Sequence, residues 1–305
     1  MANLKDIRKR IGSVKNTQKI TRAMKLVSAA KFAKVSIAAK SAAPYGDGLA
    51  AMVHELSEIL GDKIKSDLFE SRQEKKVTVV VISSDRGLCG GLNANINKKL
   101  ATFSKEKKLQ QISVDVVSLG RKVSSFVNNN GQLFTSVLFK REKVIEKPNN
   151  DGAKDIVDIM TKRFRDKETD AVYLIYPKFI SALSQVPTVA KLLPIDQSEV
   201  TNVANIKTTS SSSHSKNSNM VVNYIVEPSP EKLLDQLLVK QLTNKMYRAF
   251  LESSASEHGA RMTAMDSATN NASDVISSLT LVYNRGRQAA ITKELIEITS
   301  GAEAL

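Results

Sequence analysis

The sequence predicts an α/β protein in which long helices at the two ends of the chain pair as an antiparallel coiled coil, with a mainly parallel sheet between them in sequence. Residues 1–40 and 231–305 contain no proline and few glycines, as expected of long helices. The residues between them alternate between short β-branched runs and helical patterns. These observations divide the 305 residues into a helical segment 1–60, an α/β domain 76–227 and a helical segment 229–305.

The first helix is predicted from a heptad pattern. Alternate steps of three and four residues from Leu4 reach apolar residues at both ends of the segment but polar ones in the middle, at Gln18, Thr21, Lys25 and Ser28. Apolar residues stand one position earlier there, at Ile20, Met24 and Val27, which predicts that the seam shifts by one position and later returns without breaking the helix. Pro44–Gly46 predicts the end of this helix, and a more exposed helix is expected at Leu49–Leu60.

The central residues predict a Rossmann-like α/β domain. Val77–Ile82 is a β-branched run of strand length, followed by the turn-prone residues Ser83–Gly87. Similar runs predict strands at Val114–Leu119, Leu133–Phe139, Ala171–Tyr176 and Val221–Val226. Helical patterns lie at Leu92–Phe103, Arg121–Asn128 and Asp151–Phe164, and this alternation favours a mainly parallel sheet. Residues 207–219 include six serines and are expected to form a mobile loop.

The last segment, Glu231–Leu305, predicts one helix about 110 Å long at 1.5 Å per residue, which must project beyond a compact domain. Its heptad seam runs from His258 to Ala290 and uses small and polar residues as often as large ones, so a loose pairing with the first helix is expected. Apolar residues also lie off the seam, at Val275, Leu281, Val282, Ala289 and Ile291. The pair is therefore expected to present apolar surface to another molecule.

The positive charge of the chain is concentrated at one end. Residues 1–40 hold eleven basic residues and one acidic residue, and so carry ten of the 14 net positive charges. Because these charges share the helix with an apolar seam and aromatic residues make up only 5% of the chain, a basic surface facing protein is favoured. A nucleic-acid-binding protein that uses this basic helix is the alternative.

Several chemical functions are excluded by composition. One cysteine, Cys89, rules out an intrachain disulfide, and three scattered histidines give no metal-ligand spacing. No apolar run approaches the ~18 residues of a membrane span, so the chain is not expected to cross a bilayer. The turn Ser84–Asn93 follows a strand and opens a helix, but it lacks the lysine and hydroxyl of a phosphate-binding loop. A structural turn with a buried Cys89, no cofactor and no catalytic site are predicted.

Four segments resemble the gamma subunit of rotary ATP synthases, and the resemblance covers essentially the whole chain. They are residues 11–31 (beginning Ile-Gly-Ser-Val-Lys), 84–93 (Ser-Asp-Arg-Gly-Leu-Cys-Gly-Gly-Leu-Asn), 257–272 (beginning Glu-His-Gly-Ala-Arg) and 284–302 (beginning Asn-Arg-Gly-Arg-Gln). The resemblance implies the central rotor shaft of a proton-driven ATP synthase, itself not an enzyme. It couples rotation of the membrane c-ring to ATP synthesis or hydrolysis in the catalytic beta subunits. The implied partners are three alpha and three beta subunits, epsilon and the c-ring.

The resemblance also implies contacts with the alpha/beta head at seven positions. These are Met24, Lys25, Glu257, Arg261, Gln288, Thr292 and Glu294. Met24 matches the position where the N-terminal helix meets the lever loop of the beta subunits, and Gln288, Thr292 and Glu294 match a polar catch higher on the shaft.

The implied foot of the rotor is formed by Tyr224 and Glu227, which match the part that meets the c-ring. Val226 stands between them where relatives often carry an aromatic residue. The regulatory cysteine pair of the plastid form is absent. The resemblance implies a peripheral protein on the cytoplasmic face of a bacterial plasma membrane, or alternatively on the matrix face of the mitochondrial inner membrane.

Overall fold

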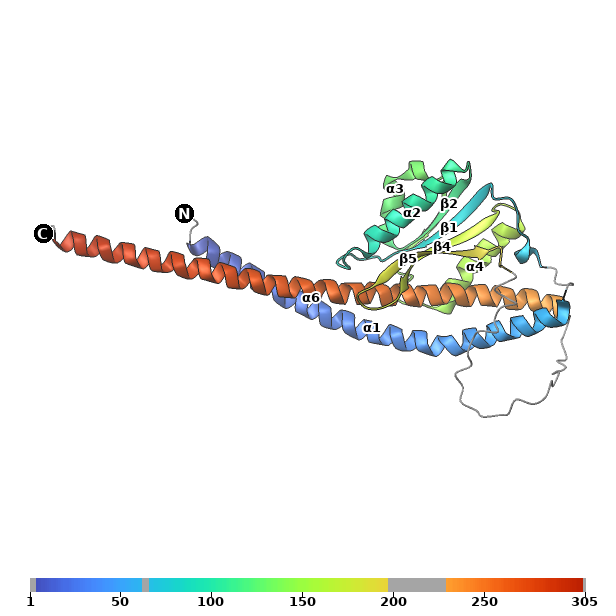
Figure 1. Cartoon of the computed structure of the whole chain (residues 1–305), viewed down its shortest axis with the longest axis horizontal. Helices are drawn as coiled ribbons and strands as arrows, with labels where there is room; N and C mark the ends of the chain where they lie inside the picture. Colours follow the sequence, from blue (N-terminus) through green and yellow to red (C-terminus); the bar gives the residue numbers. More distant parts are fainter. Residues whose placement is uncertain (1–3, 62–65, 197–228, 304–305) are drawn as a thin grey trace, which may run out of the picture.

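The computed structural model describes residues 4–61, 66–196 and 229–303, and it consists of a long helix pair that carries an α/β domain on one side (Figure 1). Helix α1 (Leu4–Leu60) and helix α6 (Pro230–Glu303) run antiparallel along each other, so both ends of the chain lie at the same end of the molecule. The predicted antiparallel pair is therefore confirmed. Within the described ranges, no helix is long and apolar enough to cross a membrane.

Helix α1 does not end at Pro44, contrary to the sequence prediction. It continues through this proline to Leu60 because its second half is held by packing: Leu49, Val53, Leu56 and Leu60 are all buried in the core. Gly46 packs closely against α6, since a Cβ there would collide with the side-chain amide of Asn244. Gly46 is thus a packing residue, and the stretch expected to be exposed lies partly inside the protein.

The sheet has the order β3-β2-β1-β4-β5 and is parallel except for β5. Its strands are β1 (Lys76–Ile82), β2 (Ser113–Leu119), β3 (Ser136–Arg141), β4 (Ala171–Phe179) and β5 (Gln185–Leu193). The helices of this domain are α2 (Leu92–Leu109), α3 (Arg121–Asn129) and α4 (Asn150–Arg165). Two short 3₁₀ turns, Asp67–Phe69 and Gly131–Leu133, complete the described elements. The predicted mainly parallel sheet is confirmed.

One predicted strand has different bounds in the structure, and one strand was not predicted. The third strand begins at Ser136, because residues 131–133 form a 3₁₀ turn that packs Leu133 against the core beneath α2. The antiparallel strand β5 was missed, since Pro187 interrupts an otherwise ordinary strand pattern and is tolerated at the edge of the sheet. The predicted strand Val221–Val226 and the serine-rich loop 207–219 lie outside the described residues.

The core has two parts, one on each face of the sheet. One face of β1, with Val80 and Ile82, packs toward α4, α6 and the second half of α1. The other face, with Val77, Val79 and Val81, packs toward α2 and α3. This double burial explains why β1 is a continuous apolar run without alternation. The sheet is thereby fixed to the helix pair, so the two cannot turn independently.

Candidate functional site

The seam between α1 and α6 is polar in its centre. Thr21 and Ser28 are buried, and Gln18 and Lys25 are partly buried, whereas Ile20 and Val27 are 60% and 57% exposed. The predicted one-position shift of the seam is therefore wrong. The seam keeps its register because its polar residues find partners across the pair: the Thr21 and Thr269 hydroxyls lie 2.8 Å apart, and Lys25 Nζ lies 2.5 Å from Asp266 Oδ1.

Two of these apolar residues of α1, Met24 and Val27, border a pocket of about 340 Å³. It lies between α1, the turn after β1 and α6, and its lining includes Met24, Val27, Leu88, Glu257 and Arg261. Three of the residues predicted to contact the head, Met24, Glu257 and Arg261, thus come together from two helices. Leu88 supplies an apolar rim that is 62% exposed, although its backbone has a positive φ of 63°.

The floor of this pocket is a buried ion pair. Arg261 donates from Nη2 to Glu257 Oε1 at 2.6 Å, and from Nε and Nη2 to the Gly87 carbonyl oxygen at 3.3 and 3.2 Å. Burial raises the pKa of the Glu257 carboxyl, an effect that Arg261 only partly offsets. Burial, reinforced by the positive charges of Arg261 and Lys31, lowers the pKa of His258 to about 4. Arg261, supported by Glu257, therefore holds the turn to α6, and both residues line the pocket.

The other predicted head contacts lie on different parts of the helices. Gly286 packs against Leu4, so α6 continues beyond this level with no described part of α1 beside it. Gln288, Thr292 and Glu294 are exposed there. The Thr292 hydroxyl donates to the Gln288 carbonyl oxygen at 2.9 Å, which places these two on one face, whereas Glu294 lies about half a turn further round the helix. Tyr224 and Glu227, the predicted foot, lie outside the described residues.

Apolar side chains are also exposed on α6, both in the part paired with α1 and beyond Gly286. The residues predicted to lie off the seam, Val275, Leu281, Val282, Ala289 and Ile291, are all exposed, as expected. Ile291, Leu295 and Ile298 follow helical spacing and form one stripe, with exposed fractions of 49%, 57% and 67%. Exposure of this many large apolar side chains in one region indicates a surface that another protein covers.

The turn Ser84–Asn93 is occupied by hydrogen bonds within the chain. Asp85 accepts from the backbone N–H groups of Arg121 (3.0 Å) and Lys143 (2.9 Å), and Asn93 Oδ1 accepts from the Ser84 N–H (3.2 Å). Cys89 is buried, as predicted, and burial raises the pKa of its thiol. The turn therefore ties β1, α2 and α3 together.

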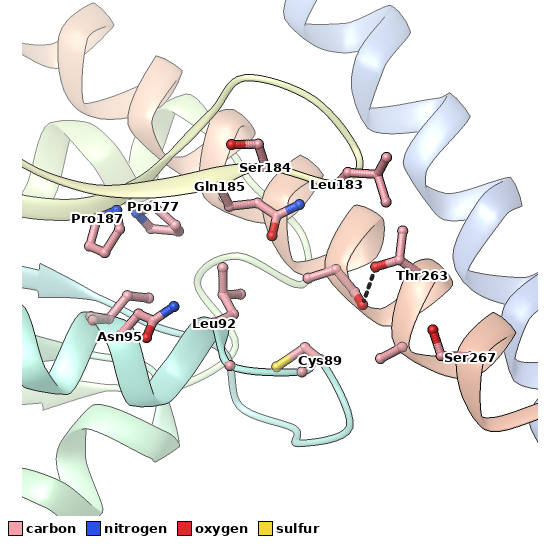
Figure 2. A pocket seen from close by; sticks show the side chains of 15 residues that line it. Cys89, Leu92, Asn95, Pro177, Leu183, Ser184, Gln185, Pro187, Thr263 and Ser267 are labelled. Carbon is pink, nitrogen blue, oxygen red and sulfur yellow. Dashed lines mark hydrogen bonds between the residues drawn. The ribbon is translucent and has the colours of Figure 1, made fainter. Parts of the chain in front are cut away.

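A second pocket, of about 490 Å³, opens beside this turn (Figure 2). Cys89, Leu92 and Asn95 line one side, and residues of the β4–β5 hairpin and of α6 face them across the opening. The Thr263 hydroxyl, on the α6 side, is already bonded to the Ala260 carbonyl oxygen at 3.0 Å. Among the described residues, no cluster of three or more His, Cys, Asp or Glu side chains could hold a metal ion.

Comparison with known proteins identifies the family. A family model described as ATP synthase matches residues 3–305. The chain is 42% identical to the ATP synthase gamma chain of Geobacter metallireducens over 100% of its own length and 99% of that protein. It is 40% identical to the ATP synthase gamma chain of Pelotomaculum thermopropionicum over the full length of both. The chain belongs to the ATP synthase gamma chain family.

Solved structures agree with the gamma chain fold. A central stalk/c-ring chain of the Tetrahymena thermophila mitochondrial ATP synthase is 25% identical, with a TM-score of 0.58 over 82% of this chain and 99% of that one. A rotor chain of the Euglena gracilis mitochondrial ATP synthase, 16% identical, shares the fold with a TM-score of 0.61 over 94% of this chain and 98% of that one.

Sequence reasoning missed three features of this gamma chain family member. It did not anticipate that Asp266 pairs with Lys25, that Thr269 bonds to Thr21, or that Leu88 forms part of the pocket. Thr269 stands on the predicted seam of α6 and Thr21 on the regular heptad steps of α1, so keeping that regular register would have found their pairing. Leu88 carried no such signal, because only the fold brings its turn beside α1.

Proposed function

We propose that the chain is the central rotor shaft of a proton-driven ATP synthase. It couples rotation of the membrane c-ring to conformational change, and hence to ATP synthesis or hydrolysis, in the catalytic beta subunits. The observation that carries this proposal is the match to the gamma chain family over residues 3–305, combined with a helix pair that projects beyond its domain. The chain itself is a non-catalytic subunit of the complex.

The proposed partners are three alpha and three beta subunits, which surround the part of the helix pair that projects beyond the α/β domain. Epsilon and the c-ring are the proposed partners at the opposite end of the molecule. The exposed apolar residues and the basic surface of α1 support contact with a surrounding head. Relatives from bacteria support a peripheral position on the cytoplasmic face of a bacterial plasma membrane. The matrix face of the mitochondrial inner membrane is the alternative.

The coupling follows from asymmetry. Three identical beta subunits can adopt different conformations at the same time only if the shaft contacts each of them differently. Helices α1 and α6 allow this because they present different side chains in different directions. Shifting one site from 1:99 to 99:1 between two states requires about 5.5 kcal/mol of differential interaction. Linkage makes this coupling reciprocal, so rotation changes nucleotide affinity and nucleotide turnover changes the angle of the shaft.

The proposed contact residues fall into three groups. Met24, with the exposed rim formed by Val27 and Leu88, is the apolar contact for the beta subunits, since methionine adapts to a moving apolar surface. Glu257 and Arg261 support that contact from below, through the ion pair and its bonds to Gly87. These residues make up the first group. The second group lies on the part of α6 beyond Gly286 and consists of Gln288, Thr292 and Glu294. The third group is the foot at the c-ring, formed by Tyr224 and Glu227.

Co-purification tests the proposal. The full chain is tagged, expressed in its source organism and purified by affinity. It is expected to co-purify with alpha and beta subunits in a ratio of three of each to one of this chain. Membranes reconstituted with the complex should then pump protons when ATP is hydrolysed. Recovery of nucleic acid with neither subunit would instead establish the alternative function, with the basic helix as its binding surface.

A further inference from the structure

Two polar contacts join α1 to α6 midway along the helix pair. Thr21 pairs with Thr269 and Lys25 pairs with Asp266. Either threonine hydroxyl can donate to the other. If Thr21 is the acceptor, its own proton bonds the Gln18 carbonyl oxygen at 3.0 Å. If Thr269 is the acceptor, its proton bonds the Met265 carbonyl oxygen at 2.7 Å. Thr21 is buried, so its hydroxyl must keep such a partner.

These contacts are satisfied in only one alignment of the helices. The seam around them mixes small and polar residues with large apolar ones, so apolar packing alone specifies the alignment only weakly. If α1 slid by one heptad, Lys25 would face Gly259 or Ser273, neither of which carries a carboxylate. Thr21 would then face the apolar Met262 or Ile276, so its hydroxyl would keep only the bond to the Gln18 carbonyl oxygen within α1 and the contact between the helices would be lost.

We propose that the pairs Thr21–Thr269 and Lys25–Asp266 form a register lock that fixes the position of α1 along α6. Polar residues at seam positions specify register in coiled coils at some loss of stability. The lock also makes Lys25 and Asp266 positioning residues, because Met24 is adjacent to Lys25 and lines the pocket with Glu257 and Arg261. The positioning role rests on the proposed rotor function, whereas the lock itself does not.

Disulfide formation in the full chain measures the register directly. In a Thr21→Cys/Thr269→Cys chain the two thiols face each other across the pair, while the native Cys89 is buried and constant in every variant. Adding Asp266→Lys places two cations together and is expected to slow crosslinking about threefold. Adding Lys25→Asp as well reverses the pair and is expected to restore the original rate.

A matched control separates register from a general effect of charge. Asp155→Lys breaks the Arg141–Asp155 pair of the α/β domain, whose exposure of 38% and 58% resembles the 39% and 47% of Lys25 and Asp266. It should leave the crosslinking rate unchanged. Because the two cysteines replace the threonine pair, these variants test the Lys25–Asp266 pair by itself. An Asp266→Lys variant that crosslinks at the original rate, or a charge reversal that fails to restore it, overturns the lock as a two-pair device.

The assembled synthase tests the positioning role. With Thr21 and Thr269 intact, Asp266→Lys is expected to lower proton pumping per ATP hydrolysed about twofold, and the added Lys25→Asp to restore it. If Lys25 instead contacts the head directly, the reversal fails to restore pumping and the positioning role is overturned. If the native chain never assembles with alpha and beta subunits, the proposed function is refuted. The crosslinking experiment does not depend on assembly, so it still tests the register lock.

Discussion

Leu88 combines two unfavourable properties: its side chain is 62% exposed, and its backbone lies in the left-handed region with φ 63°. A branched apolar residue in this conformation costs on the order of 1 kcal/mol, and exposure returns none of it. The residue lies on the rim of the pocket next to Met24 and Val27. This combination is understandable if the side chain is buried by a partner.

Leu88→Asn should therefore stabilise the isolated chain and weaken its assembly. Asparagine adopts the left-handed conformation readily, so we expect the free energy of unfolding to rise by about 1 kcal/mol in urea titrations. Loss of the apolar rim should lower the affinity for the alpha/beta head, measured by titration of the reconstituted head.

Gln111→Asn is the control for that substitution, because Gln111 is exposed at a φ of 60° far from the helix pair. It should stabilise the chain without changing affinity for the head. Unchanged affinity in Leu88→Asn as well would show that Leu88 is not a contact.

His258 should make the chain less stable in acid. Its pKa is lowered from 6.5 to about 4 by burial and by Arg261 and Lys31. Between these pH values the unfolded chain binds a proton that the folded chain does not, so stability falls as the pH falls. We expect the thermal midpoint of the native chain to drop further between pH 6.5 and pH 5 than that of His258→Gln.

The neighbouring Glu257 opposes this trend, because its raised pKa lets the folded chain bind a proton first as the pH falls. Since Glu257 is present in both proteins, the difference between them isolates the histidine. Equal drops in the two midpoints would contradict the assignment of this pH dependence to His258.

The chemistry of the pocket could be predicted from the sequence only in part. Met24, Glu257 and Arg261 were identified by resemblance, but nothing local showed that Glu257 and Arg261 would be buried. Their burial depends on the Gly87 carbonyl oxygen, which lies 174 residues from Arg261 in the sequence. Such long-range pairings leave no periodic signal.

At the level of elements, the predictions succeeded where the pattern was local. The run at β1 and the helices α2, α3 and α4 were recognised because periodicity and β-branching are properties of a few neighbouring residues. The seam shift at Ile20 and the helix end at Pro44 were wrong for a common reason. In both places tertiary packing outweighed local preference, through Thr269 on α6 in the first case and the burial of Leu49 and Val53 in the second.

Pro44 is the clearest test of that competition. It is exposed inside α1, where it leaves the Lys40 carbonyl oxygen without its helical N–H donor. Pro44→Ala restores the N–H donor, which stabilises the helix, but it also raises the conformational entropy of the unfolded chain. The net increase in the free energy of unfolding should be about 1 kcal/mol. The measurement is the thermal midpoint, expected to rise by about 2 °C.

Ser41→Ala controls for helix propensity alone, because Ser41 is exposed one turn before the proline. Its effect should be a few tenths of a kcal/mol at most. A lower midpoint in Pro44→Ala would mean that the proline stabilises α1 in a way its hydrogen bonding does not account for.

For the whole molecule, the distribution of charge is the feature with the widest effect. Lys9, Lys15 and Lys19 are exposed on α1, whereas Lys25 is paired with Asp266. Replacing the first three by glutamine should weaken association with the head about tenfold at low salt, because long-range attraction is lost. The difference from the native chain should shrink as salt rises, since salt screens the native attraction.

The same number of exposed lysines can be removed from α2 as a control, by replacing Lys98, Lys99 and Lys105 with glutamine. This changes net charge equally but leaves α1 intact, and it should not alter association. A result in which both triple variants weaken association alike would show that only total charge matters. If neither triple variant weakens association, the α1 lysines only form a solvated surface and do not attract the head.

The unequal length of the two long helices also determines how the molecule deforms. Up to Gly286 the shaft has two helices that share any load, and the α/β domain lies against the half of the pair that is remote from the chain ends (Figure 1). From Gly286 to Glu303 only α6 is described, so the cross-section falls to a single helix. Torsional stiffness falls with it, and a given torque twists this end most. Elastic strain should therefore collect in the narrow end, which would act as a spring between the rigid body and whatever surrounds its apolar tip.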